Sequence, residues 1–182
     1  MGKKLYELTP ELIDFIENQQ LFFVATAMNE GKINLSPKGL DSFKVLDDNT
    51  VLWLNLTGSG NETAAHMQRD NRMTIMFCAF EGKPLILRLY GTAKIYHKGT
   101  GFWKKHIDSF LAIAGGRQLV KMKIDMVQIS CGMGVPVLEY KQQREELVTW
   151  AEMQGNKGIE NYWKQKNILS LDGHSIDAKR KV

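Results

Sequence analysis

The sequence predicts a mainly β (α+β) fold: a small antiparallel β-barrel with flanking helices and a short C-terminal helical segment. Short strand-like segments follow one another through tight turns, and one helical segment is inserted between them. The crossover helices that a parallel sheet needs are too few. Together these observations favour an antiparallel barrel over a doubly wound sheet.

The first helix and the first hairpin follow from local signals. Thr9 and Pro10 are typical of an N-cap and of the first position of a helix. Residues 21–28 are rich in aromatic and β-branched side chains, a polar turn follows, and residues 33–35 resume the extended pattern, which predicts a β-hairpin. Residues 36–39 contain a proline and a glycine and are expected to end that strand.

The later elements are expected where apolar or alternating runs lie between Gly, Asp, Asn and Pro turns. The strands among them are expected at residues 45–46, 51–56, 72–80, 85–96 and 119–130. The helices among them are expected at residues 59–69, 99–110, 142–154 and 159–166. The sequence shows no internal repeat.

The chain length and composition predict one domain. The 182 residues, 43% apolar and 24% charged, suit a compact body with a sizeable core. We expect residues 1–140 to form the barrel and residues 141–182 a helical extension packed on it, within the same domain. No stretch has the length of a membrane span and the start does not resemble a secretory signal, so a cytoplasmic location is expected.

The cysteines and the net charge give little support to a metal or a nucleic acid. Cys78 and Cys131 lie far apart without zinc-ligand spacing, so no metal is expected, and Cys131 is predicted to be a buried, inert thiol. Much of the net charge of +4 comes from Lys179, Arg180 and Lys181 in a tail that we expect to be frayed. No dense basic face interleaved with aromatic residues accompanies it.

The segment TGSGNET, residues 57–63, joins an apolar run to a predicted helix and allows two interpretations. Ser59 and Glu62 have the spacing of a capping box, in which each side chain satisfies a backbone N–H. A glycine-rich turn before a helix can also hold a phosphate. Neither a Rossmann nor a P-loop pattern is present, so a phosphate bound here would belong to another architecture.

Three segments in order resemble the pyridoxamine 5′-phosphate oxidase-like family of FMN-binding split β-barrels. They are INLSPKG (33–39), WLNLTGSGNET (53–63) and VQISCGMGVP (127–136). The resemblance implies a split barrel and a homodimer with two FMN sites at the subunit interface. It places the isoalloxazine ring against the first segment and the phosphate near the second.

The candidate cofactor-binding residues carried over from the resemblance form three groups. Residues 34–38 would line the ring and the ribityl chain, and two residues of the next strand would edge the site. Hydroxyl, amide and backbone donors of the second segment would bind the phosphate. With Glu62 folded back on the helix cap, Lys38 or Arg117 must supply positive charge. The full set is Asn34, Leu35, Ser36, Pro37, Lys38, Asn55, Leu56, Ser59, Asn61, Glu62, Thr63 and Arg117.

Some of these residues also have an ordinary structural interpretation. Lys38 could be a solvated turn lysine, and Arg117, which follows two glycines, could be a surface arginine or could reach a phosphate, within its own subunit or across to the other. His66 is expected to be structural, and Trp53 to be part of the core.

The sequence departs from the members of the family that oxidise pyridoxamine phosphate. Ile33 stands where those members carry arginine, and Asn61-Glu62 where they carry basic residues. Residues 171–175 read LDGHS and lack the Arg-x-His pattern that grips the substrate. The vitamin B6 reaction is therefore not expected.

The function expected from the resemblance is that of an FMN-dependent oxidoreductase acting on a small molecule, with NADH or NADPH as a possible electron donor. Because the cofactor would carry the chemistry, no catalytic side chain is identified. The alternatives are a non-catalytic FMN-binding or redox-sensing module, or a relative that binds haem, a deazaflavin or no cofactor.

Overall fold

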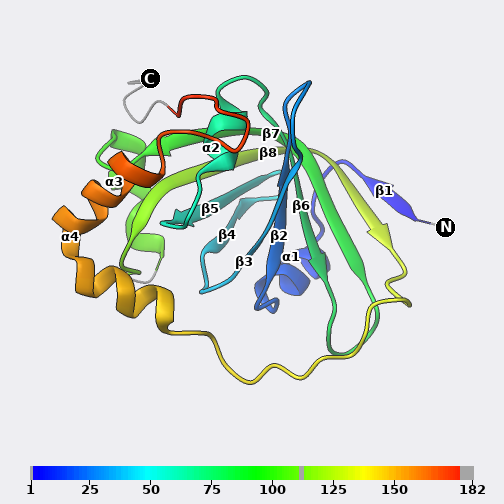
Figure 1. Cartoon of the computed structure of the whole chain (residues 1–182). Helices are drawn as coiled ribbons and strands as arrows, with labels where there is room; N and C mark the ends of the chain where they lie inside the picture. The colour runs from blue at the N-terminus through cyan, green and yellow to red at the C-terminus, as the bar shows by residue number, and fades with distance from the viewer. Residues whose placement is uncertain (1, 111–112, 177–182) are drawn as a thin grey trace.

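The computed structural model describes residues 2–110 and 113–176 and shows one antiparallel sheet of eight strands. The sheet curls around the core without closing, with helices outside it and at one end (Figure 1). The strands are β1 (Lys3–Leu5), β2 (Phe22–Thr26), β3 (Asn34–Lys38), β4 (Phe43–Asp47), β5 (Thr50–Leu56), β6 (Arg72–Cys78), β7 (Ile86–His97) and β8 (Gly116–Ser130). The helices are α1 (Pro10–Glu17), α2 (Glu62–Met67), α3 (Gly101–His106) with a 3₁₀ turn (Ile107–Ser109), and α4 (Glu146–Lys166).

The strand order is β3-β2-β6-β7-β8-β5-β4, and every pairing is antiparallel. β8 is the longest strand and pairs with β7 along one edge and with β5 and β1 along the other. β3 and β4 lie at the two ends of this order, and β1, which pairs only with β8, is a further edge strand. This arrangement confirms the predicted antiparallel split barrel.

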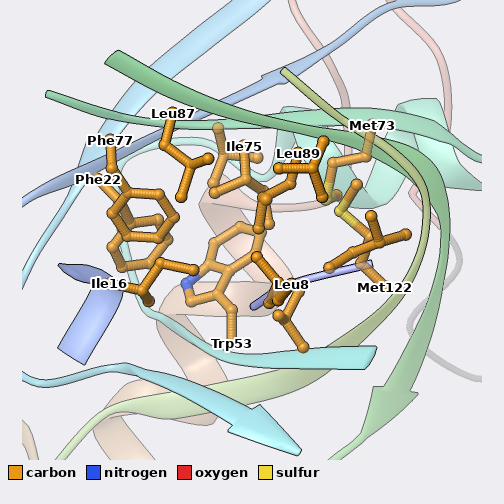
Figure 2. Packing of buried hydrophobic residues seen from close by; sticks show 14 of the residues in the cluster. Leu8, Ile16, Phe22, Trp53, Met73, Ile75, Phe77, Leu87, Leu89 and Met122 are labelled. Carbon is orange, nitrogen blue, oxygen red and sulfur yellow. The ribbon is translucent and has the colours of Figure 1, made fainter. Parts of the chain in front are cut away.

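The core fills the inside of the curled sheet around Trp53, whose side chain is 1% exposed, as predicted (Figure 2). Phe22 packs edge-on to Trp53 with 6.3 Å between ring centroids, and Phe77 lies beside Phe22 at 5.8 Å. Aliphatic side chains from β6, β7 and β8 complete the cluster. Burial of such side chains contributes roughly 1.5–3 kcal/mol each, so this cluster stabilises the curvature that brings β3 near β5 and β8.

β3 continues through Pro37 and Lys38, so the prediction that residues 36–39 end this strand is wrong. Pro37 lies opposite Phe23 in the β2–β3 register. β3 is an edge strand, and a proline whose missing N–H would face solvent does not interrupt its pairing. As a result the side chains of Asn34, Ser36 and Lys38, at every second position of β3, lie on the same face of the sheet.

The expected capping box is also not formed. α2 begins at Glu62 rather than Ser59, its N-cap is Asn61, and no side-chain bond caps it. The Glu62 carboxylate instead accepts hydrogen bonds from the backbone N–H of Leu171 at 3.1 Å. Glu62 therefore bonds to Leu171, 109 residues away in the chain, and not to the backbone at the start of the helix.

Three further findings concern the predicted elements and thiols. β1 had no local signal, because its three residues are too few for a pattern. The two predicted C-terminal helices form one element that breaks at Gly155, where φ is 60°. Cys131 is exposed rather than buried. Lys179, Arg180 and Lys181 lie outside the described residues.

None of the helices in the described ranges combines the length and the apolar character needed to cross a membrane.

Candidate functional site

One cavity brings together most of the residues that the sequence singled out. Its volume is about 480 Å³, within the range of small-molecule sites. It lies between β3, the loop after β5, the start of α2 and the start of β8. Its lining residues are Asn34, Ser36, Lys38, Asn55, Gly58, Ser59, Gly60, Asn61, Glu62, Thr63, Arg117 and Leu171.

Three of the twelve candidate residues do not line this cavity. Leu35 and Pro37 alternate with the inward side chains of β3 and are exposed, Leu35 at 64%. Leu56 packs on a second apolar cluster that includes Leu54 and Trp103. The structure therefore assembles the polar candidates and directs the apolar ones elsewhere.

Asn34 is held by a buried hydroxyl network. Its Nδ2 donates to Thr26 Oγ1 at 3.1 Å and to Thr63 Oγ1 at 3.2 Å. Thr26 Oγ1 lies 3.0 Å from Nδ1 of His66, which is 1% exposed and positions the network from behind. Because both amide hydrogens of Asn34 have partners, its Oδ1 is the group left for a ligand. Asn34 therefore offers the cavity an acceptor.

The loop after β5 begins at Thr57, which is hydrogen-bonded to the residue before β8 and to α4. Thr57 donates through its N–H and its hydroxyl to the Gly115 carbonyl, at 2.9 and 2.7 Å. The indole Nε1 of Trp163, on α4, donates to Thr57 Oγ1 at 2.8 Å. These bonds hold the start of the loop against β8 and α4, so Ser59 and Asn61 are presented from a fixed backbone.

Arg117 is a buried cation, which overturns the surface-arginine interpretation. It is 6% exposed, and its Nη1 donates to the Gly60 carbonyl at 3.2 Å and to Asn167 Oδ1 at 2.5 Å. Its Nε has no partner among the described residues, and no carboxylate there pairs with it. Burial lowers the pKa of Arg117 to about 10, so the group stays charged at neutral pH.

Lys38 is the second cation of the cavity. Its Nζ lies 5.3 Å from the centroid of the Trp53 ring, and it has no carboxylate partner among the residues that the structure describes. Burial, and to a smaller degree the Arg117 charge, lower the pKa of Lys38 to about 8. The one carboxylate in the lining, Glu62, is turned to the Leu171 amide. The cavity is thus suited to an anion.

Sequence reasoning assigned no role to two residues that shape this cavity. Leu171 lines it, and Asn167 holds Arg117 from behind. Asn167 ends α4 and Leu171 follows it, and they contact residues 50 and 109 positions away in the chain. No local pattern could reveal these contacts, because they depend on how α4 packs.

The comparisons place the chain in one family. The model of the pyridoxamine 5′-phosphate oxidase family matches residues 8–131. The pyridoxamine 5′-phosphate oxidase family protein ustO of Aspergillus flavus is 37% identical over 186 residues, covering 91% of this chain and 74% of ustO.

Two solved structures share the fold. HupZ of Group A Streptococcus superposes with a TM-score of 0.53 at 24% identity, covering 72% of this chain and 99% of its own. The FAD binding protein of Mycobacterium smegmatis has a TM-score of 0.50 at 12% identity, covering 69% and 97%. On the family match and the ustO identity, this chain belongs to the pyridoxamine 5′-phosphate oxidase family.

Proposed function

We propose that this protein binds FMN and acts as an oxidoreductase on a small molecule. One observation carries the proposal: Lys38 and Arg117 face the same cavity without a carboxylate partner among the described residues. Unbalanced buried charge is unfavourable without a ligand of opposite sign. A phosphate monoester carries nearly two negative charges at neutral pH and would balance both cations.

The other lining groups fit the remainder of FMN. Ser59 and Thr63 supply hydroxyls to the lining of the cavity, whereas Asn34 and Ser36 supply an acceptor and a hydroxyl along β3. The M. smegmatis neighbour binds FAD, which carries the same ring system. We favour FMN for this chain because its single phosphate matches the pair of cations in the cavity.

Bound FMN would supply hydride or electron transfer, so the protein needs to provide position, polarity and access. Lys38 and Arg117 would hold the phosphate, and Asn34 would accept a hydrogen bond from the ligand. This division of labour agrees with the described lining, in which no serine or threonine hydroxyl is hydrogen-bonded to a lysine, histidine or carboxylate. The substrate and an electron donor such as NADH or NADPH would approach from the open side of the cavity.

We also propose that the reaction is not the oxidation of pyridoxamine phosphate. Ile33, at the position of the family's arginine, is 76% exposed and does not line the cavity. The segment where the Arg-x-His pattern would lie instead forms a turn fastened by the Asp172–Lys32 ion pair at 2.7 Å. Neither position offers a cationic grip for that substrate.

The proposed assembly is a homodimer that encloses the cofactor. Ile33 and Leu35 leave apolar surface beside the cavity, at the edge strand β3. A second copy covering this edge would remove that surface from water and would protect the unpaired strand.

The test of the function is an absorbance spectrum of the purified protein with and without FMN, followed by anaerobic addition of NADPH or NADH. We expect flavin bands that shift on binding and bleach on addition of one of the two donors. Bands that shift but never bleach would contradict reduction by either nucleotide and support a non-catalytic module. A protein with no affinity for FMN would contradict the proposal as a whole and turn attention to haem or a deazaflavin.

A further inference from the structure

The residues that follow α4 turn back over the cavity. Residues 167–176, here called the C-terminal strap, pass across α2 (Figure 1). Asp172 forms an ion pair with Lys32 in the β2–β3 turn, with 2.7 Å between Oδ1 and Nζ. The N–H of Leu171 holds the Glu62 carboxylate. The strap is therefore bound to the β2–β3 turn through Lys32 and to α2 through Glu62.

Asn167 begins the strap and contacts the cavity wall from behind. It is 5% exposed and does not itself line the cavity. Its Oδ1 accepts from Arg117 Nη1 at 2.5 Å, and its Nδ2 donates to the carbonyls of Gly58 at 3.1 Å and Ser59 at 3.4 Å. The whole side-chain amide is thus used to join the cation to the loop.

These bonds fix the orientation of the peptide groups in the loop after β5. The carbonyl oxygens of Gly58 and Ser59 accept from Asn167, and that of Gly60 accepts from Arg117. In a trans peptide the following N–H points to the opposite side, so the amides of Ser59 and Gly60 point away from Asn167, and the amide of Asn61 points away from Arg117 Nη1. None of these three amides donates to another described residue. Ser59, Gly60 and Asn61 line the cavity, so their unpaired amides are donors that an anionic ligand can use.

The neutrality of Asn167 matters as much as its geometry. An amide oxygen orients a guanidinium without cancelling its charge, whereas a carboxylate at the same place would form an ion pair and compete with an anionic ligand. Arg117 lines the cavity, and its Nη2 donates to no other described residue, so part of the guanidinium remains available.

We propose that Asn167 is a positioning residue for the phosphate end of the ligand, an inference that rests on the proposed FMN site. It holds the Arg117 guanidinium and the amides of the loop in the orientation that receives a phosphate, and it leaves the arginine charge free to bind it.

The experiment compares the dissociation constants of FMN and riboflavin, which differ by the phosphate, for the unmodified protein and for Asn167→Asp. The matched control is Asn156→Asp, which makes the same charge change on the exposed face of α4. We expect Asn167→Asp to weaken FMN at least about tenfold while riboflavin changes by less than about twofold, because only the phosphate contact is lost. The control should leave both constants unchanged.

Equal loss of FMN and riboflavin, or no loss of either, would overturn the proposal, because a merely structural role does not distinguish the two ligands. Asn167→Ala replaces the aspartate variant if the latter does not fold, with the same direction expected. If the unmodified protein binds neither flavin, the proposed function fails, and inorganic phosphate then tests the strap. Phosphate that raises the melting temperature of the unmodified protein but not of Asn167→Asp would support the role of Asn167, and no rise in the unmodified protein would overturn it.

Discussion

Lys38 illustrates how the site depends on the protonation of single residues. Burial and the neighbouring Arg117 charge lower its pKa to about 8 in the ligand-free pocket. A bound dianionic phosphate would stabilise the protonated amine and raise that pKa again. Binding above pH 8 must therefore be accompanied by proton uptake.

We predict that FMN affinity falls as the pH rises from 7 to 9. The phosphate is already dianionic above its second pKa of about 6, so the change comes from the loss of the Lys38 proton. The dissociation constant should increase by up to about tenfold per pH unit above the lysine pKa. Fluorescence titrations at several pH values measure it, and Lys38→Met should bind FMN more weakly with a flatter pH profile.

The control for this prediction is Lys94→Met, because Lys94 also lies over an aromatic ring, that of Tyr96 at 5.5 Å, but outside the cavity. Lys94→Met should keep the pH dependence of the parent. An unchanged pH slope in Lys38→Met would assign the effect to another group.

The same pKa has the opposite effect on the stability of the ligand-free protein. The Lys38 pKa is lower in the folded state than its ordinary value of 10.5, so between about pH 8 and 10.5 the unfolded chain binds more protons. The contribution of this residue to the free energy of unfolding therefore rises with pH across that window, while FMN affinity falls.

At the scale of elements, the β7–β8 pair carries a close contact that only glycine permits. The register shifts between Tyr90 and Gly91, and a Cβ on Gly91 would lie 1.9 Å from the Lys123 carbonyl oxygen. Gly91→Ala should separate the two longest strands locally.

We predict that Gly91→Ala lowers the free energy of unfolding by about 2 kcal/mol or more, as expected for overpacking against a rigid backbone. Urea unfolding followed by Trp fluorescence measures the change. Gly134→Ala is the matched control, because a Cβ there has no neighbour within 4 Å. Equal stability of Gly91→Ala and the parent would contradict the described register.

The elements show which parts of the fold a sequence can predict. The β2–β3 hairpin, β5, β7 and α1 have local signals, such as the Thr9 cap and the apolar alternation, and they form close to where those signals lie. The continuation of β3 past Pro37 could not be predicted. A sheet tolerates a proline on an edge strand, and only the strand order of the whole sheet shows that β3 is an edge.

The same distinction holds for the candidate site. The resemblance identified nine residues that line the cavity, because ordered motifs mark both of its walls. It also included Leu35 and Pro37, whose side chains the strand alternation directs outward. The burial of Arg117 and the role of Asn167 could not be predicted, because they arise where α4 and β8 meet in space.

At the scale of the whole molecule, the outer surface near β3 is the proposed seam between two copies. Ile33 and Leu35 are 76% and 64% exposed and lie close together at the start of β3. Charged residues placed there would be costly to bury in an interface.

We predict that the protein is a dimer and that Leu35→Lys shifts it toward the monomer. Size-exclusion chromatography with light scattering measures the mass of both. Met153→Lys is the control, because Met153 is also an exposed apolar residue, at 80%, and lies on α4. A monomeric parent, or a Leu35→Lys variant that dimerises as tightly as the parent, would contradict the proposed seam.

³¹P NMR of the FMN complex between pH 5 and 8 tests most directly whether the cavity with Lys38 and Arg117 holds the phosphate of FMN. Free FMN takes up a proton near pH 6, as phosphate monoesters do. Beside two cations the bound phosphate should keep the resonance of the dianion well below that pH, because opposite charges favour the ionised form. A bound phosphate that titrates like free FMN would lie in solvent, and the account of this site would be wrong.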